Sequence, residues 1–279
     1  MIKAAFKRLP LPLQNLARKL INIKRRHNIA MAYYRPHLAM IRRWMWRDKE
    51  LSNFYYRITP ENRDHLAHMV ATVTGASHDV ITGYFSELED DDELREHLEG
   101  SLKQAAYGKA IEIHYGRRIG WYAFTRILKP CVVIETGIDH GVGSCVLASA
   151  ILRNRAEGFE GNYYGTEIRP EAGQLFRGKY AEAGKILYGD SIESLQAFNG
   201  QIDLFVNDSD HSGEYEYHEY QTILNKLSPA GVILGDNAHA TDALSRFSLE
   251  HNRQFLFFSE KPAQHWYPGA GIGISYLKR

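Results

Sequence analysis

Residues 131–144 read CVVIETGIDHGVGS: a short apolar run, an acidic residue and a turn with three glycines. The stretch that follows is apolar and predicts a helix. Glycine has no Cβ, so a strand that enters a helix through such a turn lets the backbone approach a nucleotide-like ligand closely. The carboxylate of Glu135, at the end of the run, favours a ligand with a positive group and argues against a pyrophosphate. By itself, such a turn is as typical of tight packing as of a cofactor site.

Short apolar runs alternate with amphipathic stretches from this point onward. The runs cover residues 131–135, 163–167, 186–188, 204–208, 231–235, 255–258 and 271–276. Strands that alternate with helices predict βαβ units and a mostly parallel sheet. Ligands of such sheets bind at the carboxyl ends of the strands, near the point where the strand order reverses. We therefore expect the functional residues directly after these runs.

The region before the first strand is predicted to be helical. Thr59-Pro60-Glu61 combines a capping hydroxyl, a first-turn proline and an acid, and Gly75 is a plausible stop for that helix. Helical patterns continue over residues 94–106 and 119–128. The acidic run at residues 87–93 is interpreted as a solvated loop and helix start rather than a metal cluster.

The composition is that of an ordinary globular protein, with 44% hydrophobic and 24% charged residues in 279. No apolar run approaches the ~18 residues of a membrane-spanning helix. The basic start lacks the apolar core and cleavage site of a secretory signal. Cys131 and Cys145 are too few for a disulfide scaffold or a cysteine-based zinc site. Both are predicted to be core residues of a protein in the reducing cytoplasm.

Positive charge is concentrated at the N-terminal end. Residues 1–50 hold thirteen Lys or Arg against two acids, whereas the remainder holds 21 basic and 31 acidic residues. The region is predicted to be helical in pieces, because apolar residues recur at helical spacing in two stretches: Leu13, Leu16, Leu20 and Ile23, then Tyr34, Leu38, Ile41 and Met45. A basic amphipathic arm of this kind has two interpretations. It packs on protein, either its own domain or a second subunit, or it lies on an anionic membrane surface. We expect no nucleic-acid partner, because the rest of the chain is acidic.

The next two strand ends supply further polar groups. Glu167 ends the second predicted strand, 24 residues after Gly143. A carboxylate at about this distance is suited to accept the ribose hydroxyls of an adenosine ligand. Gly189-Asp190-Ser191 follows the third strand, where a side chain can reach the adenine amino group. Three successive strand ends with suitable polar residues predict an adenosine-containing cofactor.

The fourth and fifth strand ends point to a metal ion. Asp208 ends the fourth run, and Asp236 with Asn237 follows the fifth. Neighbouring strand ends bring these oxygen donors together, and such donors suit Mg²⁺ or another oxygen-preferring divalent ion. In the alternative interpretation, Asp236 and Asn237 cap the following helix and Asp208 only lines the pocket. His211 and His239 are further potential ligands.

Taken together, these motifs resemble those of a class I S-adenosylmethionine (SAM)-dependent methyltransferase. Within that class they resemble the metal-dependent O-methyltransferases, and especially the macrocin O-methyltransferase and cephalosporin-hydroxylase-like branch. The resemblance covers about residues 105–279. It depends on Glu-Thr-Gly-x-x-x-Gly at 135–141, Glu167, Gly-Asp-Ser at 189–191, Asp-Ser-Asp-His-Ser at 208–212, and Asp-Asn at 236–237. It implies a Rossmann-like α/β fold with a mostly parallel seven-stranded sheet whose last strand is antiparallel.

The resemblance also implies roles for individual residues. The expected cofactor-binding set is Glu135, Gly137, Gly141, Gly143, Ser144, Glu167, Asp190, Ser191 and Asp208. The expected metal ligands are Asp208, Asp236 and Asn237, with Asp210 or His211 as the general base. Members of the family often have Gly-x-Ser where this chain has Gly-Val-Gly-Ser, so the role of Ser144 stays open.

The expected reaction is methyl transfer from SAM to a hydroxyl of a saccharide or another polyhydroxylated small molecule, assisted by a divalent metal. We expect this metal to be Mg²⁺. Residues 260–269 are polar and aromatic, which suits a sugar and equally suits a Pro/Gly turn packed by Trp266. The alternatives are a nicotinamide-dependent oxidoreductase and a non-catalytic binding module.

We expect a homo-oligomer in the cytoplasm, peripheral to the inner face of the membrane. Its predicted parts are a basic amphipathic helical arm (1–50), a helical region packing on the core (51–118) and the methyltransferase domain (119–279).

Overall fold

The computed structural model describes residues 10–46, 55–105 and 112–278. The chain divides into two compact units, which we describe separately. One unit comprises Met1–Arg47 with Gln264–Trp266, and the other comprises Asp48–Ala263 with Tyr267–Arg279.

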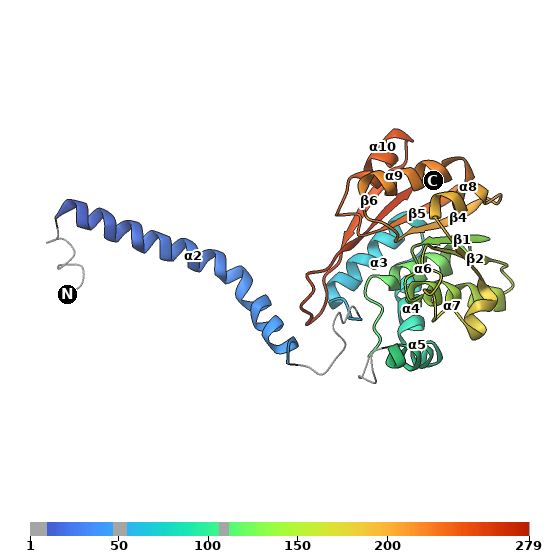
Figure 1. Cartoon of the computed structure of the whole chain (residues 1–279), viewed down its shortest axis with the longest axis horizontal. Helices are drawn as coiled ribbons and strands as arrows, with labels where there is room; N and C mark the ends of the chain where they lie inside the picture. Colours follow the sequence, from blue (N-terminus) through green and yellow to red (C-terminus); the bar gives the residue numbers. More distant parts are fainter. Residues whose placement is uncertain (1–9, 47–54, 106–111, 279) are drawn as a thin grey trace. The chain divides into compact units, whose positions relative to one another are not determined.

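The first unit contains one long helix, α2, which spans Leu11–Trp44 (Figure 1). The sequence pattern predicted helical pieces, whereas the helix runs continuously through Pro36, which lacks the N–H for one intrahelical hydrogen bond. None of its residues is buried. Among the described residues, no helix has the length and apolar character needed to cross a membrane.

The described part of the second unit contains a seven-stranded sheet in the order β3-β2-β1-β4-β5-β7-β6. β7 is antiparallel to both of its neighbours, and the other neighbouring strands pair in parallel. The predicted mostly parallel sheet with an antiparallel last strand is therefore confirmed. The strands are β1 (Val132–Thr136), β2 (Asn162–Glu167), β3 (Gly184–Tyr188), β4 (Ile202–Asn207), β5 (Leu227–Asp236), β6 (Gln254–Ser259) and β7 (Gly271–Tyr276).

Helices cover both faces of this sheet (Figure 1). The helices of the second unit are α3 (Pro60–Thr74), α4 (His78–Glu89), α5 (Asp92–Ala105), α6 (Arg118–Leu128), α7 (Val142–Ala156), α8 (Ser191–Ala197), α9 (Gly213–Ile223) and α10 (Ala243–Glu250), with short 3-10 turns η1 (Gly178–Ala183) and η2 (Leu224–Lys226). Successive strand side chains point to opposite faces. Val133 accordingly packs in one core with α3 to α7, whereas Ile134 packs in a second core with α8, α9 and α10.

The helices before β1 begin and end where local chemistry predicts. The Thr59 hydroxyl accepts a hydrogen bond from the backbone N–H of Asn62 at 3.3 Å, and Gly75 ends α3 in the left-handed region at φ +74°. The acidic run at 87–93 is less solvated than predicted. Asp91 is buried, where it caps α5 and pairs with an arginine of α7, and Glu87 binds the guanidinium of Arg126.

One cysteine prediction was wrong. Cys145 is buried in α7, but Cys131 is exposed, because it precedes β1 rather than lying inside the strand.

A close backbone approach fixes the edge of the sheet where β1 and β4 end. Gly137 has φ +76°, and a Cβ added there would lie 2.2 Å from the carbonyl oxygen of Asp208. Any other residue would both strain the backbone and collide with the turn after β4. The glycine predicted for cofactor approach is therefore also required for packing.

Candidate active site

The strand order reverses between β1 and β4, so a crevice is expected outside their carboxyl ends. Thr136 pairs with Asn207 across these strands, and Asn207 pairs with Gly235 of β5. The next residues along the three strands are Gly137, Asp208 and Asp236. Gly137, Asp208 and Asp236, which were predicted from separate sequence motifs, therefore each follow a residue of the same hydrogen-bonded row, at one edge of the sheet.

Glu135 lies beneath the start of α7 and is 1% exposed. Its carboxylate accepts hydrogen bonds from the hydroxyls of Ser144, at 2.7 Å, and Tyr163. A Cβ on Gly143 would lie 2.3 Å from its Oε1 atom. The extra glycine in this turn therefore makes room for the Glu135 carboxylate, and Ser144 holds it. Burial raises the pKa of Glu135 to about 7.

The turn before α7 is buried at Gly141, against the segment at Leu175 and Phe176. Gly141 precedes the helix at φ +99°, and no side chain caps the α7 N-terminus. The predicted role of this turn in approaching a cofactor is therefore compatible with its geometry.

Glu167 ends β2 and is almost fully buried. Its carboxylate accepts hydrogen bonds from the backbone N–H groups of Asp139 and Arg169, each at 3.0 Å, and pairs with the Arg169 side chain. A carboxylate has about four lone-pair sites, so these three contacts leave room for about one further hydroxyl donor unless the Arg169 side chain moves away. Its position is fixed from two loops, which is what a ribose-binding acid requires.

Asp190 and Ser191 lie at the start of α8. Asp190 caps the helix by accepting from the Glu193 N–H at 3.1 Å, and it accepts a second bond from the Tyr215 hydroxyl at 2.9 Å. Ser191 is buried and donates to Glu219. Asp190 therefore lies near the predicted position, whereas the hydroxyl of Ser191 is used inside the protein.

Glu219 was not predicted to belong to this site. It is fully buried on α9 and accepts hydrogen bonds from side chains at the ends of β1 and β4 and the start of α8, namely Thr136, Asn207, Ser209 and Ser191. Burial raises its pKa to about 7. Glu219 therefore ties together three of the chain segments that form the edge.

Asp208, His211 and Asp236 form one cluster, in which ligand atoms of all three lie within 4.8 Å of one another. The Asn237 amide nitrogen is 3.0 Å from His211 Nε2. The three predicted metal ligands are thus gathered at adjacent strand ends. The alternative helix-capping role does not apply, because α10 begins only at Ala243, after Asp242.

A buried arginine binds this cluster from the protein interior. Arg117, at the start of α6, binds both carboxylate oxygens of Asp236 and also pairs with Glu260 at 3.0 Å. Glu260 in turn accepts from the Tyr56 hydroxyl at 2.9 Å. The guanidinium holds the pKa of Asp236 below its ordinary value. Glu260, the first residue of the polar segment 260–269, therefore has a structural role as a partner of Arg117.

The donor set fits a divalent cation that prefers oxygen. Burial, together with the charge of Asp236, raises the pKa of Asp208 to about 8. Arg117 pairs with both Asp236 and Glu260, so one positive charge is shared by two carboxylates, whereas Asp208 pairs with His211. Carboxylate and amide oxygens are the ligands that Mg²⁺ and similar ions prefer. A bound cation would add positive charge beside Asp208.

The two candidate bases differ in position. Asp210 is exposed and accepts a hydrogen bond from the Ser212 backbone N–H. His211 faces the cluster, 3.6 Å from Asp208 Oδ1 and 3.2 Å from Glu216 Oε1. The neighbouring carboxylates of Asp208 and Glu216 raise the pKa of His211 to about 10. His211 is therefore the better placed residue for proton transfer.

Fold and site together define a Rossmann-like α/β domain with polar residues gathered at the carboxyl ends of its parallel strands. A family model described as a methyltransferase domain matches residues 134–238, which run from β1 to just past Asn237. Among solved structures, the chain is similar to the O-methyltransferase from Bacillus cereus in complex with S-adenosylhomocysteine (SAH), with 16% identity, a TM-score of 0.50, and coverage of 78% of this chain and 99% of that chain. This likeness establishes the fold.

The chain also aligns with the O-methyltransferase TomG of tomaymycin synthesis from Streptomyces achromogenes, in complex with SAM. That alignment has 12% identity and a TM-score of 0.48, and it covers 68% of this chain and 91% of that chain. A search of curated protein sequences found no match.

Replacement of Glu135 by Gln should stabilise the protein in a pH-dependent manner. The folded state keeps the Glu135 proton up to about pH 7, whereas the unfolded chain ionises near 4.5. Between these two pH values, rising pH therefore lowers the free energy of unfolding of the wild type. The difference in unfolding free energy between Glu135→Gln and the wild type grows over the same range and is constant above pH 7. Urea unfolding of both proteins from pH 4.5 to 8 measures it. The exposed Glu160→Gln variant should show no such trend, and a pH-independent difference for Glu135→Gln would contradict the assignment.

Proposed function

We propose that this protein is a SAM-dependent O-methyltransferase assisted by a divalent metal. The main support is the arrangement at one edge of the sheet: a glycine turn with Glu167 on one side, and Asp208, Asp236 and His211 on the other. The first group suits an adenosine cofactor, and the second suits a metal-bound hydroxyl acceptor. Their placement on either side of the β1–β4 crevice brings donor and acceptor together, which methyl transfer requires.

The cofactor half uses carboxylates at the ends of β2 and β3. Glu167 would accept the ribose hydroxyls, and Asp190, one strand further, lies at the adenine end; Glu167 pairs in register with Tyr188, two residues before Asp190. Gly137 and Gly141 leave the backbone near the methionine part free of side chains. Glu135 would act from beneath this turn rather than by direct contact, since Ser144 and Tyr163 hold its carboxylate.

The acceptor half uses the metal ligands. Asp208, Asp236 and Asn237 would hold a divalent ion such as Mg²⁺, with Arg117 keeping Asp236 ionised and oriented. When bound, such an ion lowers the pKa of an acceptor hydroxyl. His211, which lies beside Asp208, would take the hydroxyl proton in its neutral form, which a positive charge at Asp208 would favour.

The proposed acceptor is a saccharide or another polyhydroxylated molecule, as in the macrocin O-methyltransferase-like branch. Adjacent hydroxyls can chelate one ion, and the edge offers polar side chains around it. Tyr267, at 5.8 Å ring-centroid distance from Tyr56, adds an aromatic pair beside the Glu260 ion pair.

Calorimetric titration with SAH tests the cofactor. The wild type should bind one equivalent, and Glu167→Gln should weaken binding about tenfold or more, because a hydrogen bond to a charged group is lost. Glu171→Gln, an exposed neighbour on the same loop, is the matched control and should bind like the wild type. Absence of SAH binding by the folded wild type would refute the proposed function.

Binding of Mn²⁺, followed by electron paramagnetic resonance with SAH present, tests the metal. Asp208→Asn removes one carboxylate and should lower Mn²⁺ affinity at least about tenfold. Asp210→Asn, two residues away and exposed, should retain Mn²⁺ binding. Equal Mn²⁺ affinity in the wild type and Asp208→Asn would exclude this cluster as the metal site.

For α2 we propose an anionic membrane surface as partner. The helix contains eight Lys or Arg and no acid between Leu11 and Trp44. Leu13, Leu16 and Leu20 lie on one face and are each about half exposed. Like charges would oppose pairing of two such helices, whereas anionic headgroups would attract the charges and the acyl boundary would bury the leucines.

Co-sedimentation of the full chain with vesicles tests this proposal. Vesicles with phosphatidylserine should bind the protein about tenfold more strongly than neutral ones, and Leu16→Ser with Leu20→Ser should remove most of the binding. Leu249→Ser, which changes a 79% exposed leucine on α10, is the control and should have no effect. Equal binding to both vesicle types would contradict the proposal, as would self-association that the α2 substitutions abolish.

A further inference from the structure

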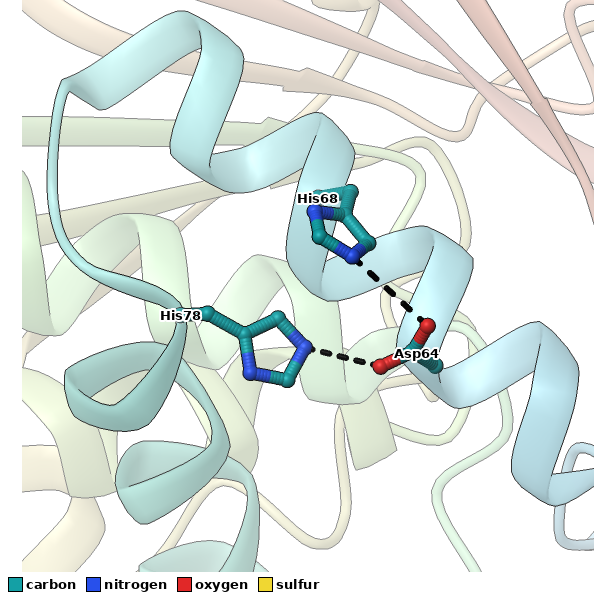
Figure 2. A group of neighbouring side chains, drawn as sticks. All are labelled: Asp64, His68 and His78. Atoms are coloured by element: carbon teal, nitrogen blue, oxygen red, sulfur yellow. Dashed lines mark hydrogen bonds and ion pairs between the residues drawn. The ribbon is translucent and has the colours of Figure 1, made fainter.

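A second group of potential metal ligands lies on the helices that precede the sheet. Asp64 and His68 are four residues apart on α3, so both side chains project from the same face of that helix. The left-handed turn at Gly75 reverses the chain, and His78 begins α4 beside them. Figure 2 shows the two imidazoles directed at the single carboxylate from the two helices.

We propose that Asp64, His68 and His78 form a binding site for a Zn²⁺-like transition-metal ion, separate from the cluster at the sheet edge. Each residue offers one ligand atom, and these atoms lie within 4.8 Å of one another. Two imidazoles and a carboxylate are a typical ligand set for zinc, with the fourth position left to water. Oxygen-preferring ions such as Mg²⁺ favour the other cluster.

The distances suit such an ion. His78 Nε2 is 2.8 Å from Asp64 Oδ1, and His68 Nε2 is 3.7 Å from Asp64 Oδ2. Ligands of tetrahedral zinc, at bond lengths of about 2.1 Å, are about 3.4 Å apart. The two observed distances, each to a different oxygen of Asp64, lie on either side of this value, and one ligand atom from each residue lies within 4.8 Å of the others. At 3.7 Å, His68 points its nitrogen at the carboxylate without making a hydrogen bond to it.

The surroundings leave these side chains available. Their side-chain exposures are 53% for Asp64, 68% for His68 and 36% for His78, so small rotations and a coordinating water are both allowed. In the described part of the chain, no lysine or arginine pairs with Asp64; the neighbouring Arg63 pairs with Glu89 instead. A bound cation would neutralise this carboxylate and link α3 to α4.

Zinc binding to the tag-free full-length protein tests the site, with Mg²⁺ in excess to occupy the other cluster. Equilibrium dialysis should give one tight Zn²⁺ equivalent for the wild type. His68→Ala and His78→Ala should lower this affinity at least about tenfold, and Co²⁺ should give the visible absorption of a tetrahedral site only where both histidines remain. The matched control is His65→Ala, an exposed histidine of the same helix outside the cluster, which should bind like the wild type.

Thermal melting in metal-free buffer shows that the variants are folded, and Zn²⁺ should raise the melting temperature of the wild type and His65→Ala but not of His78→Ala. The proposal is overturned if the wild type binds no Zn²⁺, or if all four chains bind it with the same stoichiometry and affinity.

Discussion

The buried guanidinium of Arg117 is the interaction on which the site depends. It joins Asp236 at the end of β5 to Glu260 after β6, and Tyr56 completes the group from the segment before α3. Removing one partner of such a buried pair costs about 3–5 kcal/mol, because the remaining charge has no solvent. Gly116 permits the arrangement, since a Cβ there would lie 2.9 Å from Glu260 Oε1. The position of Asp236, and hence of the proposed metal, is therefore set from the interior.

The electrostatics of the edge follow from this pairing. Arg117 satisfies Asp236, but no described arginine forms an ion pair with the buried Glu135 and Glu219 or with the partly buried Asp208, and desolvation raises the pKa of each. Acidic groups of this kind disfavour further negative charge nearby and favour a cation. The cationic sulfonium of SAM and a divalent metal are both ligands of that sign. The charge pattern thus agrees with the proposed pair of ligands, and disagrees with a pyrophosphate-containing nicotinamide cofactor.

The sequence predicted the strands and their ends well, because an apolar run followed by Gly, Asp or Glu is a local signal. It could not predict the partner of Asp236, because Arg117 lies 119 residues away and resembles its neighbour Arg118 in sequence. Glu219 was missed for a related reason: several acids of α9 look like a solvated face, and only tertiary packing buries this one. The prolines and charges of α2 suggested helical pieces, whereas the chain forms one helix through Pro36.

The two proposed ion sites differ in ligand chemistry. The edge cluster presents mainly oxygen donors around Asp208, whereas the α3–α4 cluster presents two imidazoles, so borderline transition metals and hard cations are sorted by donor type. Hydrogen bonds nevertheless connect α3 to the segment that contains Glu260. Asn62, in the first turn of α3, binds the backbone of Ser259 and Lys261, the residues on either side of Glu260. An ion that links α3 to α4 therefore stabilises the helix whose first turn holds the Glu260 segment, and so supports the Arg117 ion pair without touching the crevice.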